Sequence, residues 1–229
     1  PSFRYRDFQV SELLRDGFPV SMQLGLAAMI LAVTLGFLAG SLAALKRNTP
    51  GDVAVMGLAM TGIAVPNFVV APLMTLILGV WLSLLPVGGW GGLNHAVLPV
   101  IALALPQIAA IARLTRGSML EVLRADFIRT ARAKGLSEGA MVTGHALKAA
   151  ALPVLSYLGP ATAGIITGSV VIEQIFGIPG IGRYFVQGAL NRDYTLVMGV
   201  VIFYAGLIIT LNLIVDLLYP LFDPRVRND

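Results

Sequence analysis

The side chains that could bind a charged or polar partner are concentrated in residues 113–151, which carry seven of the sixteen basic residues in the chain. At mid-membrane depth seven such charges would cost roughly 17 kcal/mol, so this segment lies outside the hydrocarbon core. Apolar Val122, Phe127, Ile128 and Ala131 recur at helical spacing among these charges. The pattern predicts an amphipathic helix at a membrane face, able to lie on lipid or to dock into a partner's groove.

A tight turn and a second helix follow in the sequence. Gly135 suits the left-handed position that ends a helix. Ser137 can cap the next helix, with Glu138 favourably placed in its first turn. A passive linker has no need of such caps, and a DNA-binding helix-turn-helix conflicts with membrane spans on both sides. We therefore expect a docking element for a cytoplasmic protein and no nucleic-acid partner.

Catalytic groups and cofactor ligands are not indicated by the sequence. It contains no Gly-x-x-x-x-Gly-Lys-Ser/Thr phosphate loop, no catalytic triad and no cluster with metal-ligand spacing. We expect a chain that is not an enzyme and that binds no cofactor itself. Asp216 is a candidate path residue, because acids inside membranes often mark transport routes. Near the end of its span, it can instead reach water or pair with an arginine.

The elements that must position these residues are membrane spans. The 229 residues are 57% hydrophobic and only 12% charged, about half the charged fraction of a soluble domain. Four stretches lack Asp, Glu, Lys and Arg, and each is as long as the roughly 20 residues that cross a bilayer. These stretches are residues 17–45, 53–112, 149–172 and 194–215. The sequence predicts an all-α, polytopic membrane helical bundle. With no cysteine, disulfides and thiolate metal sites are excluded.

Five spans are expected in this chain, because the glycine-rich loop 85–92 divides the longest charge-free stretch. The spans cover about 20–45, 53–84, 96–112, 152–172 and 194–219. Residues 1–16 read as an external N-terminal segment, and 17–229 as a transmembrane domain that includes the loop 113–151. Kinks are expected at prolines in the second and third spans, namely Pro66, Pro72, Pro99 and Pro106. Close helix packing is expected at two glycine pairs, Gly36 with Gly40 and Gly164 with Gly168.

The distribution of basic residues predicts the orientation of the chain. Eleven lie in the loop after the first span, in residues 113–151 and in the C-terminal tail, against five on the other side. Because basic loops stay in the cytoplasm, the N-terminus is expected outside and the C-terminus inside. The tail contributes Arg225 and Arg227, and the N-terminal segment contributes Arg4, Arg6 and Arg15 to the smaller group.

The run Phe127–Ser137 resembles the EAA loop of ABC importer permeases, in the form found in the oligopeptide and dipeptide branch. The likeness continues over nearly the whole chain, in His145–Lys148, Leu152–Leu155, Glu173–Gly182, Ala189–Tyr194 and Asp223–Arg227. Leu152-Pro153 stands farther from Gly135 than in the general EAA pattern, a spacing that the peptide branch shares. Permeases of this type resemble six-span proteins with a cytoplasmic N-terminus. Since this chain begins at Pro1, we expect its first span and most of the first external region to be missing.

The resemblance implies a type I ABC permease fold and a subunit that translocates oligopeptides or dipeptides across a bacterial inner membrane by alternating access. It implies docking of an ATPase on ten residues: Arg129, Thr130, Ala131, Arg132, Ala133, Lys134, Gly135, Leu136, Ser137 and Glu138. It also suggests an external gate or loop built from Glu173, Phe176, Pro179, Gly180 and Gly182, where a plain surface turn is the alternative.

The implied partners are a second homologous permease, two ATPases that bind ATP and Mg, an external binding protein, a peptide and membrane lipid. Import of nickel chelates, glutathione or another small solute is an alternative within the class. A stand-alone channel or a secondary transporter is an alternative outside it. Inverted internal repeats would favour the latter, and none is evident in the sequence.

Overall fold

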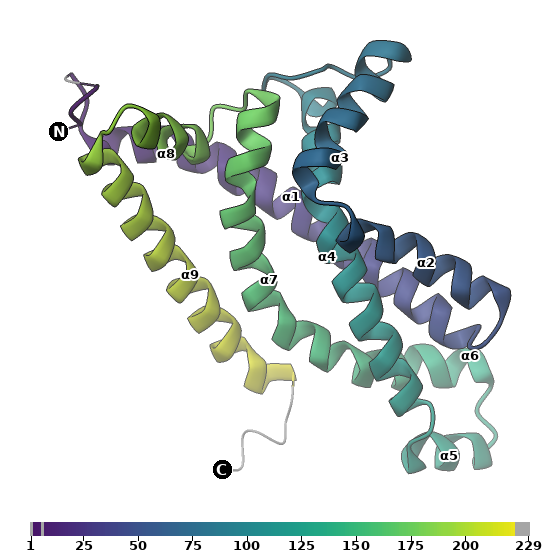
Figure 1. The fold of residues 1–229 in the computed structure, drawn as a ribbon. Helices are drawn as coiled ribbons and strands as arrows, with labels where there is room; N and C mark the ends of the chain where they lie inside the picture. The colour runs from purple at the N-terminus through teal and green to yellow at the C-terminus, as the bar shows by residue number, and fades with distance from the viewer. Residues whose placement is uncertain (1, 6, 223–229) are drawn as a thin grey trace. The chain divides into compact units, whose positions relative to one another are not determined.

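The computed structural model describes residues 2–5 and 7–222, and these are almost entirely helical (Figure 1). The helices are α1 (Val10–Leu45), α2 (Pro50–Ala64), α3 (Asn67–Met74), the π-helix η1 (Thr75–Trp81), α4 (Leu93–Val122), α5 (Asp126–Ala133), α6 (Glu138–Met141), the π-helix η2 (Val142–Ala146), α7 (Leu147–Phe176), α8 (Ile181–Leu190) and α9 (Tyr194–Phe222). No strand occurs among the described residues. The all-α prediction is confirmed.

Long apolar helices occupy the predicted spans. Four helical segments within the described residues are long and apolar enough to cross a membrane, and they contain α1, α4, α7 and α9. The count becomes five when α2 and the α3–η1 pair are taken as one broken span. This agrees with the five predicted spans. Arg6, Arg225, Arg227 and the run Asp223–Arg227 lie outside the described residues, and the orientation of the chain stays a prediction.

Several helix boundaries differ from the prediction in one direction. Helix α1 begins at Val10, within the segment 1–16 that was predicted to lie outside the first span. Helix α4 continues to Val122 and α7 begins at Leu147, so only residues 123–146 of the predicted loop 113–151 lie between the two long helices. Charge-free length marks the part of a helix that fits the hydrocarbon core, whereas helical hydrogen bonding continues into the polar region.

The second predicted span is interrupted at Val65 and Pro66. Pro66 precedes α3 with an extended backbone, at φ −60° and ψ 142°. Proline has no N–H for the helical ladder and pushes the preceding residue away from helical angles, which explains the break. By contrast, Pro72 lies inside α3, and α4 passes through Pro99 and Pro106 without interruption.

The chain divides into two compact units. The first comprises the described residues of 1–31, 65–105 and 161–212. Its core contains Leu13, Ile166, Ile181, Tyr184, Leu196, Val200 and Tyr204. Helix α9 begins at a cap, because Asp193 accepts hydrogen bonds from the backbone N–H of Leu196 (3.1 Å) and from the side chain of Thr195 (2.9 Å). The same carboxylate accepts from the Ser2 hydroxyl and the Arg4 N–H, which ties the N-terminal segment to this unit.

The second unit comprises the described residues of 32–64, 106–160 and 213–229. Its core cluster contains Ala44, Met119, Ile128, Met141, Ala146 and Ala150. Helices α1 and α4 approach closely, because a Cβ at Gly36 would lie 2.8 Å from the Cβ of Ile111 and one at Gly40 would lie 2.7 Å from the Cβ of Thr115. The packing role predicted for the first glycine pair is confirmed. In the second pair, the side-chain position of Gly168 lies outside the described part of the chain.

Candidate functional site

The predicted docking element is a short helix, α5, held to the second unit by one buried side chain. Ile128 is fully buried against Met119, Met141 and the rest of the second unit's core cluster. It is the buried residue of α5, and Ala131 packs against the same cluster from one turn further on. An isolated helix of eight residues is unstable in water, so its position depends on this contact.

Helix α5 ends in a Schellman turn. Gly135 has φ +84°, in the left-handed region. The Gly135 N–H donates to the Arg132 carbonyl at 3.0 Å, and the Leu136 N–H donates to the Ala131 carbonyl at 3.3 Å. These are the two bonds that define the motif. A Cβ at Gly135 would meet no atom within 4 Å, so glycine is needed here for its backbone angle and not for space.

Helix α6 begins directly after this turn, as predicted. The Ser137 hydroxyl accepts a hydrogen bond from the Ala140 N–H at 3.4 Å, which places Ser137 at the N-cap. The Arg132 guanidinium donates two hydrogen bonds, of 2.7 and 3.2 Å, to the Glu138 carboxylate. Both side chains are exposed, so this pair contributes little to stability. It links the end of α5 to the start of α6 across the turn.

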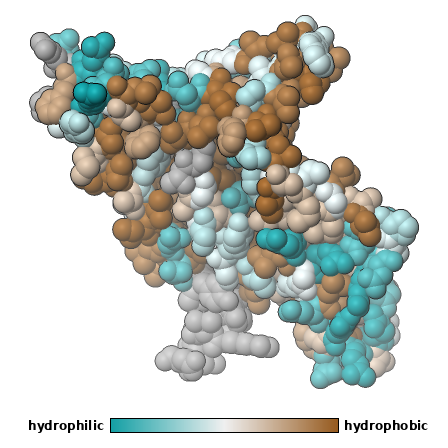
Figure 2. Space-filling view, in the orientation of Figure 1, coloured by the Kyte–Doolittle hydropathy of each residue, from teal (hydrophilic) through white to brown (hydrophobic). Residues whose placement is uncertain are grey.

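The ten predicted docking residues lie together and form a polar surface. Eight of them are exposed, and Ala131 and Leu136 are partly buried. Figure 2 shows hydrophilic side chains gathered over α5 and α6. The structure thus presents these residues where a protein partner could bind them, on an element braced by Ile128.

The predicted apolar stripe is partly wrong. Val122 belongs to α4 and not to the helix of Ile128, because α4 ends at Val122 and α5 begins at Asp126. Phe127 is half exposed and does not belong to the core cluster. Helical spacing alone did not reveal the break or the direction of Phe127. Its exposure adds an apolar group to the outward face of α5.

The predicted external loop joins α7 to α8 in the first unit, and most of its residues are buried. Phe176, Gly180 and Gly182 are buried, and Pro179 is partly buried. Glu173 is fully buried and does not reach water. Its Oε2 accepts the Gly182 N–H at 2.7 Å, and the Ser21 hydroxyl of α1 accepts the Ile181 N–H at 2.9 Å. Side chains from α7 and α1 therefore satisfy the first N–H groups of α8.

The glycines of this loop are required by close packing. A Cβ at Gly180 would lie 2.5 Å from the Ser21 hydroxyl, and one at Gly182 would lie 2.5 Å from the Cα of Val170. Across the unit, the Gly89 N–H donates to the Phe176 carbonyl at 2.7 Å, which joins the glycine-rich loop 85–92 to the end of α7. The loop is thus a tightly packed junction of three segments. A gating role for it stays a prediction.

Asp216 lies on α9 with an exposed side chain and is not brought together with the other predicted site residues. Among the described residues, no group of three or more His, Cys, Asp and Glu could hold a metal ion.

The sequence patterns did not reveal one ion pair and one helix cap. Arg116 on α4 binds Asp52 on α2 through two bonds of 2.7 and 2.6 Å, and Asp52 is almost fully buried. Sequence separation of 64 residues hides such a pair. Asp193 could have been found, because an Asp directly before an apolar helix is a strong N-cap signal. Burial by itself raises the pKa of Asp193, but hydrogen bonds from Ser2, Arg4 and Leu196 outweigh it and hold the pKa below its ordinary value.

Apolar helices of spanning length, with the exposed element α5–turn–α6 between two of them, define the class of protein as a multi-pass membrane protein. Solved transporters share the fold. The MetNI methionine ABC transporter in inward-facing conformations matches with a TM-score of 0.79, over 93% of this chain and 97% of that chain at 16% identity. An amino acid ABC transporter solved with histidines matches with a TM-score of 0.73, over 91% and 94% at 16% identity. The type I ABC permease fold is confirmed.

The chain belongs to the family of binding-protein-dependent transport system inner membrane components, whose sequence profile matches residues 24–228. It is 58% identical to the oligopeptide transport system permease protein OppB of Escherichia coli K12, over 99% of this chain and 75% of that protein. It is 48% identical to the dipeptide transport system permease protein DppB of Bacillus subtilis, over 99% and 74%. The chain is therefore an inner-membrane permease subunit of the ABC class, which separates it from stand-alone channels and secondary transporters.

Proposed function

We propose that this chain is a permease subunit of an ATP-driven importer that carries oligopeptides or dipeptides across the inner membrane. Its high identity to the permeases OppB and DppB supports peptides as the substrate class. The observation that carries the mechanism is the exposed element α5–turn–α6, whose position depends on buried Ile128. A separate ATPase subunit can move the permease only through a docking element that is exposed to it and firmly packed against the rest of the permease.

The chain itself hydrolyses no ATP, and two ATPase subunits bind ATP and Mg. One ATPase docks on the surface formed by residues 129–138, with exposed Phe127 adding an apolar contact. Motion of α5 reaches α4 and α7 through the second unit's core cluster, because Met119 lies on α4 and Ala150 lies on α7. Close packing favours this transfer, since a packed core passes on a displacement and does not absorb it.

The remaining partners follow from the proposed class. A second homologous permease completes the path, and an external binding protein delivers peptide to the side opposite the ATPases. Residues Glu173 to Gly182 are the proposed external gate. Their junction packs too tightly to deform locally, so the gate would move as one body with α7 and α8.

Uptake of a labelled tripeptide into proteoliposomes tests this function. The complete transporter, with its second permease, ATPases and binding protein, is expected to accumulate peptide only with ATP and Mg. Omitting the ATPases should abolish uptake. Uptake that continues without ATP would contradict an ATP-driven importer. Uptake of nickel chelates or glutathione in place of the peptide would contradict the proposed substrate.

A further inference from the structure

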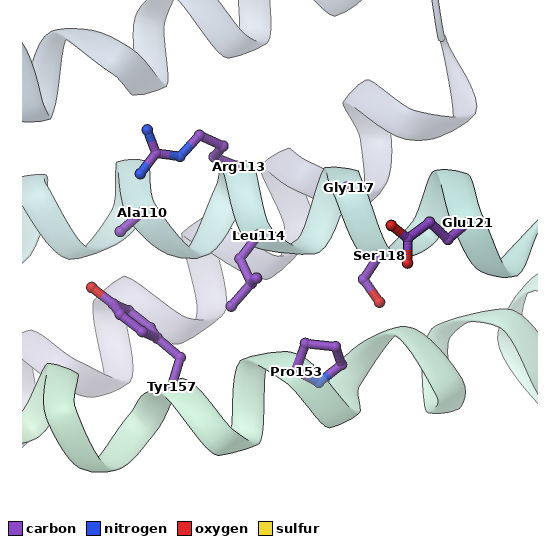
Figure 3. A pocket seen from close by; sticks show the side chains of 8 residues that line it. All are labelled: Ala110, Arg113, Leu114, Gly117, Ser118, Glu121, Pro153 and Tyr157. Carbon is purple, nitrogen blue, oxygen red and sulfur yellow. The ribbon is translucent and has the colours of Figure 1, made fainter.

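A cleft of about 440 Å³ lies between α4 and α7 within the second unit. This volume is in the range of small-ligand sites. Its floor and walls are mostly apolar, and include Leu114 and Pro153, while charged side chains stand at its two ends. Figure 3 shows Arg113 and Glu121 well apart along α4, with Arg113 on the edge of α4 that faces away from α7 and with Leu114 and Ser118 turned toward α7. The docking surface on α5 and α6 contributes no residue to this cleft.

The two charged groups have no internal partner. The side chains of Arg113 and Glu121 are exposed and make no ion pair or hydrogen bond with any described residue. Arg116 lies between them in the sequence and is fully engaged by Asp52. Both residues lie in the segment 113–151, outside the hydrocarbon core, so each charge is in contact with water or a polar partner. The pair is therefore free to bind a ligand.

The separation of Arg113 and Glu121 along α4 indicates which kind of zwitterion could bind to both. Arg113 and Glu121 are eight residues apart on one helix, which separates their Cα atoms by about 12 Å along the helix axis. An extended peptide spans about 3.3–3.6 Å per residue, so three or four residues separate its terminal charges by this distance. The two charges of a zwitterionic lipid headgroup lie much closer together. A short unblocked peptide fits the spacing, and a headgroup does not.

The middle of the cleft suits a peptide of variable sequence. The Tyr157 hydroxyl donates to the Gln107 side chain at 2.9 Å and keeps its own oxygen available as an acceptor. Ser118 adds a second hydroxyl. A Cβ at Gly117 would meet no atom within 4 Å, so the floor is open there. Hydroxyls can bind the peptide backbone, while the apolar floor and the open space at Gly117 admit different side chains.

We propose that this cleft binds the two ends of a peptide of about three or four residues in transit, with Arg113 on the α-carboxylate and Glu121 on the α-ammonium group. The inference rests on the proposed function and deepens it. It assigns recognition inside the permease to the terminal charges that all unblocked peptides share, which explains how one path can carry peptides that differ in side chain.

Thiol protection tests this assignment, because the chain contains no cysteine. Gly117→Cys places one thiol in the cleft of this subunit. Gly57→Cys is the matched control, since a Cβ at Gly57 on α2 also meets no atom within 4 Å and Gly57 does not line the cleft. The complete transporter in lipid nanodiscs is treated with a maleimide, once without nucleotide and once with ATP. In each case the rate at which this subunit is labelled is measured in the presence of tri-alanine and in the presence of N-acetyl-tri-alanine amide.

Tri-alanine is expected to slow labelling of Gly117→Cys by about tenfold, the effect of a charge-assisted contact, and to leave Gly57→Cys unchanged. The blocked peptide should give no protection, and Glu121→Gln should remove the protection by tri-alanine. Equal protection by both peptides, or none in either nucleotide state, would overturn the assignment. A thiol that stays unlabelled without peptide would also overturn it, because a partner or lipid would then fill the cleft.

The same preparation separates the two proposals. If the wild-type transporter imports tri-alanine with ATP but tri-alanine does not protect the Gly117→Cys variant, the proposed binding in the cleft is wrong and the proposed function stands. If the wild-type transporter imports no peptide, both the proposed function and the proposed binding in the cleft are wrong.

Discussion

The contact of Ile128 with the second unit's core cluster is expected to hold the docking element in place, and Ile128→Ala should release it. Ile128 is fully buried and is the side chain through which α5 enters the core. Truncating a buried isoleucine to alanine costs about 2–5 kcal/mol. Because α5 is too short to persist alone, about 3 kcal/mol of this loss shifts the balance toward the undocked helix. Its undocked population should then rise by roughly a hundredfold.

Hydrogen exchange of the complete transporter measures this population directly, because amides of a locally opened helix exchange in proportion to the open fraction. Exchange in α5 should be fastest in Ile128→Ala and intermediate in Ile128→Val, which costs only about 0.5–1.5 kcal/mol. Exchange in α8, which lies in the other unit, serves as an internal control and should not change. If α5 in Ile128→Ala exchanged at the wild-type rate, Ile128 would not be its anchor.

Two further predictions concern backbone geometry and charge. Gly135→Val places a β-branched side chain at φ +84°, which costs about 1–3 kcal/mol. The amount of peptide taken up per ATP hydrolysed should fall, while insertion into the membrane persists. Gly139→Val, at a position with equally open space, is the control and should keep normal coupling. Asp193→Asn should lower stability in detergent by about 2 kcal/mol near neutral pH, because the carboxylate accepts several hydrogen bonds. Since the folded-state pKa of Asp193 is depressed, its contribution is complete above the unfolded value of about 3.9 and is lost as pH falls below it. Thermal unfolding should therefore show a gap between variant and wild type at pH 7 that narrows toward pH 3; a gap that widens on acidification would contradict the role of the carboxylate.

Hydropathy and local caps account for what could be predicted of the fold. Charge-free runs located the spans, and Gly135 and Ser137 located the turn and the cap between α5 and α6. Both signals are local, because a helix end depends on a few neighbouring backbone groups. Helix lengths were underestimated, since polar residues such as Arg113 and Arg116 continue α4 beyond the apolar run.

Long-range contacts account for what could not be predicted. Nothing local shows that Ile128 is buried while its neighbour Phe127 is exposed, because the choice depends on Met119 and Met141 from other helices. The same holds for Glu173, whose partner Gly182 is held in place by packing around α8. In the sequence, Arg113 counts only as one of the seven basic residues of 113–151, and nothing singles out Glu121. Only the three-dimensional structure shows that both residues line one cleft and have no partner among the described residues.

Cross-linking from α5 tests most directly the claim that an ATPase docks on this element. In the cysteine-free chain, Ala133→Cys places a thiol on the exposed face of α5, and Leu93→Cys places a control thiol on an exposed residue of the first unit. Each is coupled to a photoactivatable maleimide in the complete transporter and illuminated. The ATPase subunit should be cross-linked to the Ala133→Cys variant and not to the Leu93→Cys variant. Illumination that joins no ATPase at position 133, or joins it equally at both positions, would contradict the docking account.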